Sequence, residues 1–163
     1  MWFQGPSVAR GYFEAPEASA ETFGGATASA NGDDDASWLR TGDLGFLHDG
    51  GLYIAGRRKD LIIVRGRNHY PQDIEQTVED ACASVRPGCV AAFSLDVNGE
   101  EELVVVAEIR DGDGTEQPGA LTAQIRRAVN AAHEVSPYDV ALIAARTIPK
   151  TSKIGRASCR ERV

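Results

Sequence analysis

An acidic residue and an arginine stand at two points of the chain where glycine lets a ligand approach the main chain. Asp43 ends the tripeptide Thr41-Gly42-Asp43, and Arg57 directly follows Gly56. A carboxylate accepts hydrogen bonds from two vicinal hydroxyl groups, and a guanidinium keeps its charge and presents donors in a fixed fork. Glycine has no Cβ and so permits close approach. The Asp43 carboxylate suits a ribose, although each residue alone is also typical of a capped turn or of a surface arginine.

The motifs around these residues are more specific than either residue alone. They are Trp38-Leu39-Arg40-Thr41-Gly42-Asp43-Leu44-Gly45, Gly56-Arg57-Arg58-Lys59-Asp60 and Arg65-Gly66-Arg67-Asn68-His69-Tyr70-Pro71-Gln72-Asp73-Ile74-Glu75. Together they resemble the ribose-binding and hinge segments of adenylate-forming enzymes, and the third is similar to that of the fatty acyl-AMP ligases. The resemblance implies that Asp43 binds the ribose hydroxyls of ATP, that Arg57 reaches the ribose or phosphate, and that Lys59 is a hinge between two domains.

The same resemblance implies a reaction that uses ATP and Mg²⁺. A long-chain fatty acid would be activated as acyl-AMP and passed to the phosphopantetheine thiol of an acyl carrier protein or polyketide synthase carrier domain, in lipid or polyketide biosynthesis. Two alternatives stay open: a fragment of a fatty acyl-CoA ligase, and a non-catalytic, stand-alone binding module. The family's phosphate loop, adenine site and acyl tunnel have no counterpart in these 163 residues. We therefore expect this chain alone to be inactive.

The C-terminal end departs from the family pattern. Pro149-Lys150-Thr151-Ser152 matches the segment before the family's catalytic lysine, but Lys153 then lies two positions out of register with that lysine. For this reason we assign no catalytic residue. Residues 153–163 look like the translation of a sequencing adapter, and we expect them to be a non-native tail; a genuine short deletion is the alternative.

Composition and charge argue against several classes of protein. The net charge of −7 disfavours a nucleic-acid binder, which normally presents a basic face. The longest apolar runs, 61–64 and 103–107, are far shorter than the roughly 20 residues that cross a bilayer, so we expect no integral membrane segment. The three cysteines and three histidines lack metal-ligand spacing. Free thiols and the lack of a signal peptide indicate a cytoplasmic protein.

Hydrophobic periodicity predicts a small α+β domain. The expected strands are 51–56, 60–65, 88–95, 102–109 and 140–148, and the expected helices begin at Pro71 and near Leu121 and include Ala132. We expect 60–65 to form a hairpin with 51–56, and Asn98-Gly99 to turn a second hairpin. The prediction is a small, antiparallel-rich sheet with two helices on it. By resemblance, this is the C-terminal domain of adenylate-forming enzymes, preceded by the tail of their large N-terminal domain.

We therefore divide the chain into three parts. Residues 1–57 are interpreted as the incomplete end of a large AMP-binding domain, 58–152 as a small mobile C-terminal domain, and 153–163 as the tail. The first part carries the aromatic residues Trp2, Phe3, Tyr12, Phe13 and Trp38. Such residues need a partner surface. The histidines are interpreted as structural: His48 and His133 as surface residues without partners, and His69 as an exposed or helix-capping residue.

Overall fold

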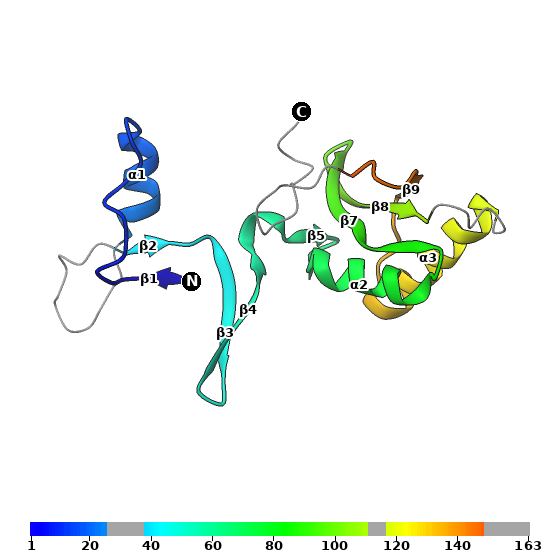
Figure 1. Ribbon diagram of the computed structural model, residues 1–163, viewed down its shortest axis with the longest axis horizontal. Helices are drawn as coiled ribbons and strands as arrows, with labels where there is room; N and C mark the ends of the chain where they lie inside the picture. The colour runs from blue at the N-terminus through cyan, green and yellow to red at the C-terminus, as the bar shows by residue number, and fades with distance from the viewer. Residues whose placement is uncertain (26–37, 111–116, 149–163) are drawn as a thin grey trace. The chain divides into compact units, whose positions relative to one another are not determined.

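The computed structural model describes residues 1–25, 38–110 and 117–148 (Figure 1). Contacts between Cα atoms divide the chain into two compact units, of which the first is Met1–Lys59 and the second begins at Asp60. The C-terminal motif 149–152, Lys153, Cys159 and the predicted tail lie outside the described residues, and the division into three predicted domains stays a prediction.

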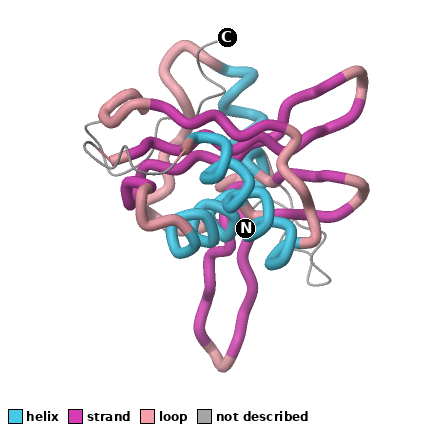
Figure 2. Tube along the Cα trace, turned by 90° about the vertical axis from the view of Figure 1, so that its right-hand side faces the viewer, coloured by secondary structure: helices cyan, strands magenta, loops and turns pink. Residues whose placement is uncertain are grey.

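The described residues of the first unit form two strand pairs and one helix. β1 (Trp2–Phe3) pairs with β2 (Leu39–Arg40), and β3 (Asp43–His48) pairs with β4 (Gly51–Arg57). The β3–β4 hairpin points downward in Figures 1 and 2. Helix α1 (Pro16–Phe23) has no counterpart among the predicted elements. Its sequence has no large apolar residue before Phe23, so it lacks the apolar stripe that predicts a helix, and the helix buries no residue.

The hairpin predicted for residues 51–65 is wrong. β4 pairs with β3, and β5 (Ile62–Val64) pairs with β6 (Arg67–His69). The two-residue turn between β5 and β6 has Arg65 at φ 52° and Gly66 at φ 76°. Such a turn closes a tight hairpin immediately after β5. A single turn of 3₁₀-helix, η1 (Arg58–Asp60), separates β4 from β5.

The second unit confirms the predicted antiparallel-rich α+β fold. β7 (Val85–Val97) and β8 (Glu100–Ile109) are antiparallel and are joined at Asn98-Gly99, where both residues have positive φ. β9 (Asp139–Ile143) runs parallel to β8 and ends five residues before the predicted end of the last strand. Helices α2 (Pro71–Ala81) and α3 (Pro118–His133) cover one face of this sheet (Figure 1).

The core of the second unit follows from helical and strand periodicity. Its buried members are Ile62, Val64, Ile74, Val78, Cys82, Val85, Val90, Ala92, Leu103, Val105, Ala107, Leu121, Ile125, Val129, Val135 and Val140. On β8 every second residue from Leu103 to Ala107 belongs to it, which identifies the face of the strand that meets the helices. Ala132, which the second predicted helix includes, lies in α3 and is exposed.

The apolar side chains described in the first unit are largely exposed to solvent. Among its described residues, no hydrophobic side chain is buried, and the exposed fraction reaches 90% for Phe13 and 77% for Leu47. Trp2, Phe3 and Tyr12 are also exposed. A segment with so much exposed apolar surface has little burial to offset its conformational entropy. The exposure favours the prediction that this segment needs a further surface.

We expect residues 60–163 to fold without residues 1–59, because every buried hydrophobic side chain among the described residues lies after Asp60. The melting temperature of the shortened protein should lie within about 4 °C of that of the full chain, the shift produced by roughly 1 kcal/mol in a domain of this size. Circular dichroism on both proteins measures it. Ile125→Ala in the shortened protein should lower stability by about 2–5 kcal/mol. If the shortened protein shows no cooperative transition, the two-unit description is wrong.

Candidate functional site

Asp43 and Arg57 lie directly opposite each other on β3 and β4. From the closed end of the hairpin to Gly45 the pairing is regular; one extra residue on β4, Ala55, then shifts it. Without this bulge Asp43 would face Gly56. Directly opposite residues of an antiparallel pair project to the same face, with Cβ atoms roughly 4.5–5.5 Å apart. The bulge therefore brings together the two residues predicted to bind a nucleotide.

Hydrogen bonds of the Thr41 hydroxyl and of the main chain fix the turn that leads into Asp43. The Thr41 hydroxyl donates to the carbonyl of Met1 and accepts from the N–H of Asp43, both at 3.1 Å. Gly42 has φ 77°, and its carbonyl accepts the N–H of Arg58 at 2.8 Å. A Cβ added at Gly42 would meet no atom within 4 Å, so this side of the turn is open. A ligand can therefore approach the backbone beside Asp43.

The two side chains are available for a polar ligand. Asp43 is half-buried and Arg57 is exposed. Within the described ranges, neither side chain takes part in a hydrogen bond or an ion pair. An acceptor and a fork of donors on one face suit a group with adjacent hydroxyls or a phosphate. The arrangement fits the predicted ribose contact, and the roles of Asp43 and Arg57 stay predictions.

Lys59 lies where the two units meet in the sequence. It is exposed, belongs to the short 3₁₀ turn between β4 and β5, and is the last residue of the first unit. Hinges consist of a few residues at element ends, which absorb changes in φ and ψ. This location suits the predicted hinge.

The turn after β5 borders a polar cavity inside the second unit. The cavity has a volume of about 260 Å³ and is lined by Val64, Arg65, Arg67, His69, Glu102, Glu134, Val135 and Ser136. Arg67 forms an ion pair with Glu134, and this contact lowers the pKa of the Glu134 carboxyl. Gly66, at the tip of the turn, has no atom within 4 Å of its Cβ position. The positive φ of Gly66 and the open space at its Cβ position suit the tight turn that joins β5 to β6.

The interpretations of all three histidines are wrong. His48 has partners, because its Nε2 lies 3.4 Å from Asp49 Oδ2 and its ring meets the ring of Tyr53 edge-on. His133 has a partner, because its Nε2 lies 2.8 Å from the Thr77 hydroxyl. His69 is only 9% exposed, and burial, followed by the charges of His133 and Arg67, lowers its pKa. Helical periodicity places Thr77 and His133 on separate helices and gives no sign of how those helices meet. The signal for these contacts was therefore absent from the sequence.

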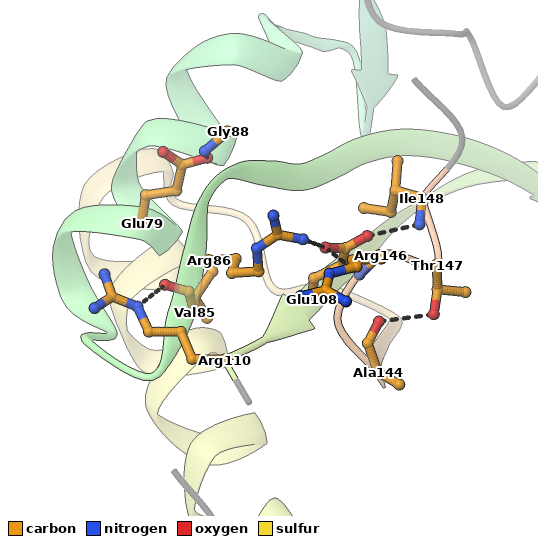
Figure 3. Close-up of polar contacts among 10 residues, drawn as sticks. All are labelled: Glu79, Val85, Arg86, Gly88, Glu108, Arg110, Ala144, Arg146, Thr147 and Ile148. Carbon is orange, nitrogen blue, oxygen red and sulfur yellow. Dashed lines mark hydrogen bonds and ion pairs between the residues drawn. The ribbon is translucent and has the colours of Figure 1, made fainter. Parts of the chain in front are cut away.

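One buried charged residue escaped the sequence analysis. Glu108 of β8 is fully buried. It lies in the predicted strand 102–109, but the strand pattern did not single it out. Its carboxylate pairs with Arg86, whose Nη1 lies 2.6 Å from Oε2 (Figure 3). An acid inside the run Val104-Val105-Val106-Ala107-Glu108-Ile109 is the sequence signal that identifies it, since charged residues are almost never buried unpaired.

The described part of the chain contains neither a membrane-spanning helix nor a cluster of metal ligands. No helix there is long and apolar enough to cross a bilayer. In the same residues, no three His, Cys, Asp or Glu side chains are grouped so as to hold a metal ion. Cys82 and Cys89 are buried and form no disulfide within the described residues.

Comparison with known proteins gives consistent relatives. Residues 59–162 match the sequence model of the family described as Disco-interacting protein 2-like, AMP domain. The chain is 46% identical to the medium-chain-fatty-acid acyl-carrier-protein ligase JamA of Moorena producens (strain JHB), over 98% of this chain and 27% of that protein. It is 41% identical to the long-chain-fatty-acid AMP ligase FadD32 of Mycolicibacterium smegmatis, over 98% of this chain and 30% of that protein. The chain thus spans less than a third of either relative.

A solved structure supports the same relationship. It is described as "Structural and Functional Studies of Fatty Acyl-Adenylate Ligases from E. coli and L. pneumophila". The similarity has a TM-score of 0.69 and 35% identity, and it covers 92% of this chain and 24% of that chain. The two units therefore correspond to one stretch of a much longer polypeptide.

The lowered pKa of His69 predicts a pH dependence of stability. The unfolded chain takes up this proton near pH 6.5 and the folded chain only at lower pH, so acid favours the unfolded state. The free energy of unfolding should fall as the pH drops through 6.5, and His69→Gln should make this fall shallower. Urea unfolding between pH 5 and 8 measures it. His48→Gln, at an exposed histidine of the first unit, is the control; equal slopes for the wild type and both variants contradict the assignment.

Proposed function

The chain belongs to the family of the Disco-interacting protein 2-like AMP domain, and from that premise we propose that it is the C-terminal part of an adenylate-forming ligase. The substrate would be a long-chain fatty acid, activated as acyl-AMP. The observation that carries the proposal is the bulged β3–β4 register, which sets Asp43 opposite Arg57 beside the open turn at Gly42. The relatives JamA and FadD32 are named as a medium-chain and a long-chain fatty-acid ligase, which supports a fatty acid as the substrate.

Two steps make up the proposed reaction. A carboxylate oxygen of the fatty acid attacks the α-phosphorus of ATP, the bond from that phosphorus to the bridging oxygen breaks, and pyrophosphate leaves. A phosphopantetheine thiolate then attacks the acyl carbon, and AMP leaves as the acyl group moves to sulfur. Both steps keep the adenosine in place, so contacts to its ribose serve both.

Asp43 and Arg57 would hold that ribose. The Asp43 carboxylate accepts hydrogen bonds from the two ribose hydroxyls, one on each oxygen. The Arg57 guanidinium donates to a ribose oxygen or to the phosphate and keeps its charge throughout. Because the carboxylate is half-buried, these bonds form where water competes less than at a fully open surface.

The triphosphate and its Mg²⁺ need groups beyond the described residues. Those residues contain no cluster of acids or histidines that fits a metal ion. This chain matches less than a third of each relative. A protein of that length therefore has room for such groups outside the matched region.

The acyl acceptor would be a carrier protein. JamA is named as a ligase for an acyl-carrier protein, which favours a phosphopantetheine thiol over free coenzyme A. Cys82 and Cys89 form no disulfide within the described residues, as is usual in the cytoplasm, where we place the reaction. In this proposal residues 1–57 complete the large domain, 58–152 form the mobile domain, and 153–163 are not native.

We expect the full-length gene product to catalyse pyrophosphate exchange that depends on a fatty acid. Asp43→Ala should lower kcat/KM for ATP about 10–100-fold, the loss expected when hydrogen bonds to a charged group are removed. Arg57→Ala should act in the same direction. Exchange assays over a series of fatty-acid chain lengths measure both effects.

A control variant and the identity of the acyl acceptor distinguish the candidate functions. Asp49→Asn, at the exposed closed end of the same hairpin, removes a carboxylate but keeps a residue that tolerates the positive φ there, so it is the matched control and should keep the wild-type rate. No exchange with any fatty acid would contradict the proposal. Acyl transfer to free coenzyme A as fast as to a carrier protein would favour an acyl-CoA ligase.

Lys59→Pro should impair the full-length enzyme by restricting the hinge. Proline fixes φ near −65° and removes an N–H, so it opposes a rotation that changes φ and ψ. Lys59→Ala keeps this freedom and is the control. Single-turnover rates of acyl-AMP formation and of acyl transfer should both fall in the proline variant, while the melting temperature changes little because Lys59 is exposed. Wild-type rates in both steps would show that the hinge lies elsewhere.

A further inference from the structure

The hydroxyl of Thr41 is bonded on both sides, and one of its two partners is the main chain of Asp43. Thr41 Oγ1 accepts the N–H of Asp43 at 3.1 Å and donates to the carbonyl of Met1, also at 3.1 Å. Only a hydroxyl places a donor and two acceptor lone pairs on one such small group. Thr41 is half-buried, so water competes less for these bonds than at an open surface. The side chain thus links the two strands β1 and β3 through Asp43.

Both peptide groups of Asp43 are bonded, and this fixes the direction of its side chain. The N–H is bonded by Thr41, and the carbonyl accepts from the main-chain nitrogen of Met1. The N–H of Thr41 also donates to the Met1 carbonyl, at 3.2 Å. The contacts use only main-chain atoms of Met1, so they do not depend on the side chain at that position. A backbone held in this way leaves Asp43 few directions for its carboxylate.

The direction of a carboxylate matters most when it must bind two hydroxyl groups at once. Two vicinal hydroxyls, one on each oxygen, require one orientation of the carboxylate plane. A single hydroxyl can be bound over a broad range of orientations, because the angular preference of one hydrogen bond at an sp² oxygen is wide. A carboxylate that is fixed before binding also avoids the cost of being ordered by the ligand. A fixed Asp43 therefore favours a sugar with both hydroxyls over a sugar with one.

We propose that Thr41 is a positioning residue: its hydroxyl fixes Asp43 and thereby sets the preference for a ribonucleotide over a 2′-deoxyribonucleotide. This inference rests on the proposed function, in which Asp43 accepts hydrogen bonds from both ribose hydroxyls. Thr41 acts through Asp43 and makes no contact with the nucleotide. Gly42, which lies between them at φ 77°, leaves the ligand side of the turn free of side-chain atoms.

Binding of AMP and of 2′-deoxy-AMP to the full-length gene product tests the proposal. Calorimetry should find that the wild type binds AMP about 10–100-fold more tightly, the loss expected for one hydrogen bond to a charged group. Thr41→Val keeps the size and branching of the side chain but has no hydroxyl. It should reduce this preference about 2–10-fold, the cost of ordering one side chain on binding. A ratio of two affinities does not depend on the fraction of folded protein, so lost stability does not imitate the effect.

Two further variants show whether the hydroxyl acts through Asp43. Thr41→Ser restores a hydroxyl at the same position and should recover the wild-type preference for AMP. Asp43→Ala should abolish the preference, and Thr41→Val added to Asp43→Ala should change the ratio no further. Two residues that act as one unit give such a non-additive result, whereas independent residues give additive changes.

The outcomes separate this inference from the proposed function. If the wild type prefers AMP but forms no acyl-AMP with any fatty acid, the proposed ligase activity fails, and Thr41→Val still decides the role of Thr41. A wild type that binds both nucleotides equally, or neither, overturns the inference. Equal weakening of both nucleotides by Thr41→Val would mean that Thr41 only stabilises the turn. A shift of the ratio by Thr41→Val in the Asp43→Ala protein, or no recovery in Thr41→Ser, also contradicts it.

Discussion

The register of the β3–β4 hairpin is the constraint on which the candidate site depends. Side chains alternate along a strand, so a slip of one residue exchanges the faces of every later position. The extra residue at Ala55 produces such a slip between the closed end of the hairpin and its open end. As a result Arg57, and not Gly56, faces Asp43. The contact between Arg58 and Gly42 then ties the ends of both strands together at the place where the first unit ends.

Irregular pairing plays the same part in the second unit. The bulge of β7 opens the ladder opposite Glu108 and lets Arg86 reach a carboxylate that lies inside the sheet. Bulges are frequent next to functional sites because they redirect side chains without disturbing the rest of a strand. In both units the regular elements supply stability or support, and the interruptions place the charged groups.

Periodicity and turn chemistry made much of the fold predictable. Pro71 and the apolar spacing from Ile74 to Val78 gave α2, and Asn98-Gly99 gave the β7–β8 turn. The partner of β4 was predicted wrongly, because neighbours in sequence were paired although Asp49-Gly50 and Arg65-Gly66 each close a separate hairpin. Bulges leave almost no trace in composition. The prediction that Asp43 and Arg57 share one site therefore followed only from the family motifs. The partners of Glu108 and His133 depend on tertiary packing, which single-chain patterns do not encode.

A crystal structure of the full-length protein with a non-hydrolysable acyl-adenylate tests the central claim most directly. The account predicts that the Asp43 carboxylate lies about 2.5–3.0 Å from both ribose hydroxyls. It also predicts that the Arg57 guanidinium lies within hydrogen-bond distance of the ribose or the phosphate. A ribose bound by other residues, with Asp43 and Arg57 both left in water, would contradict it.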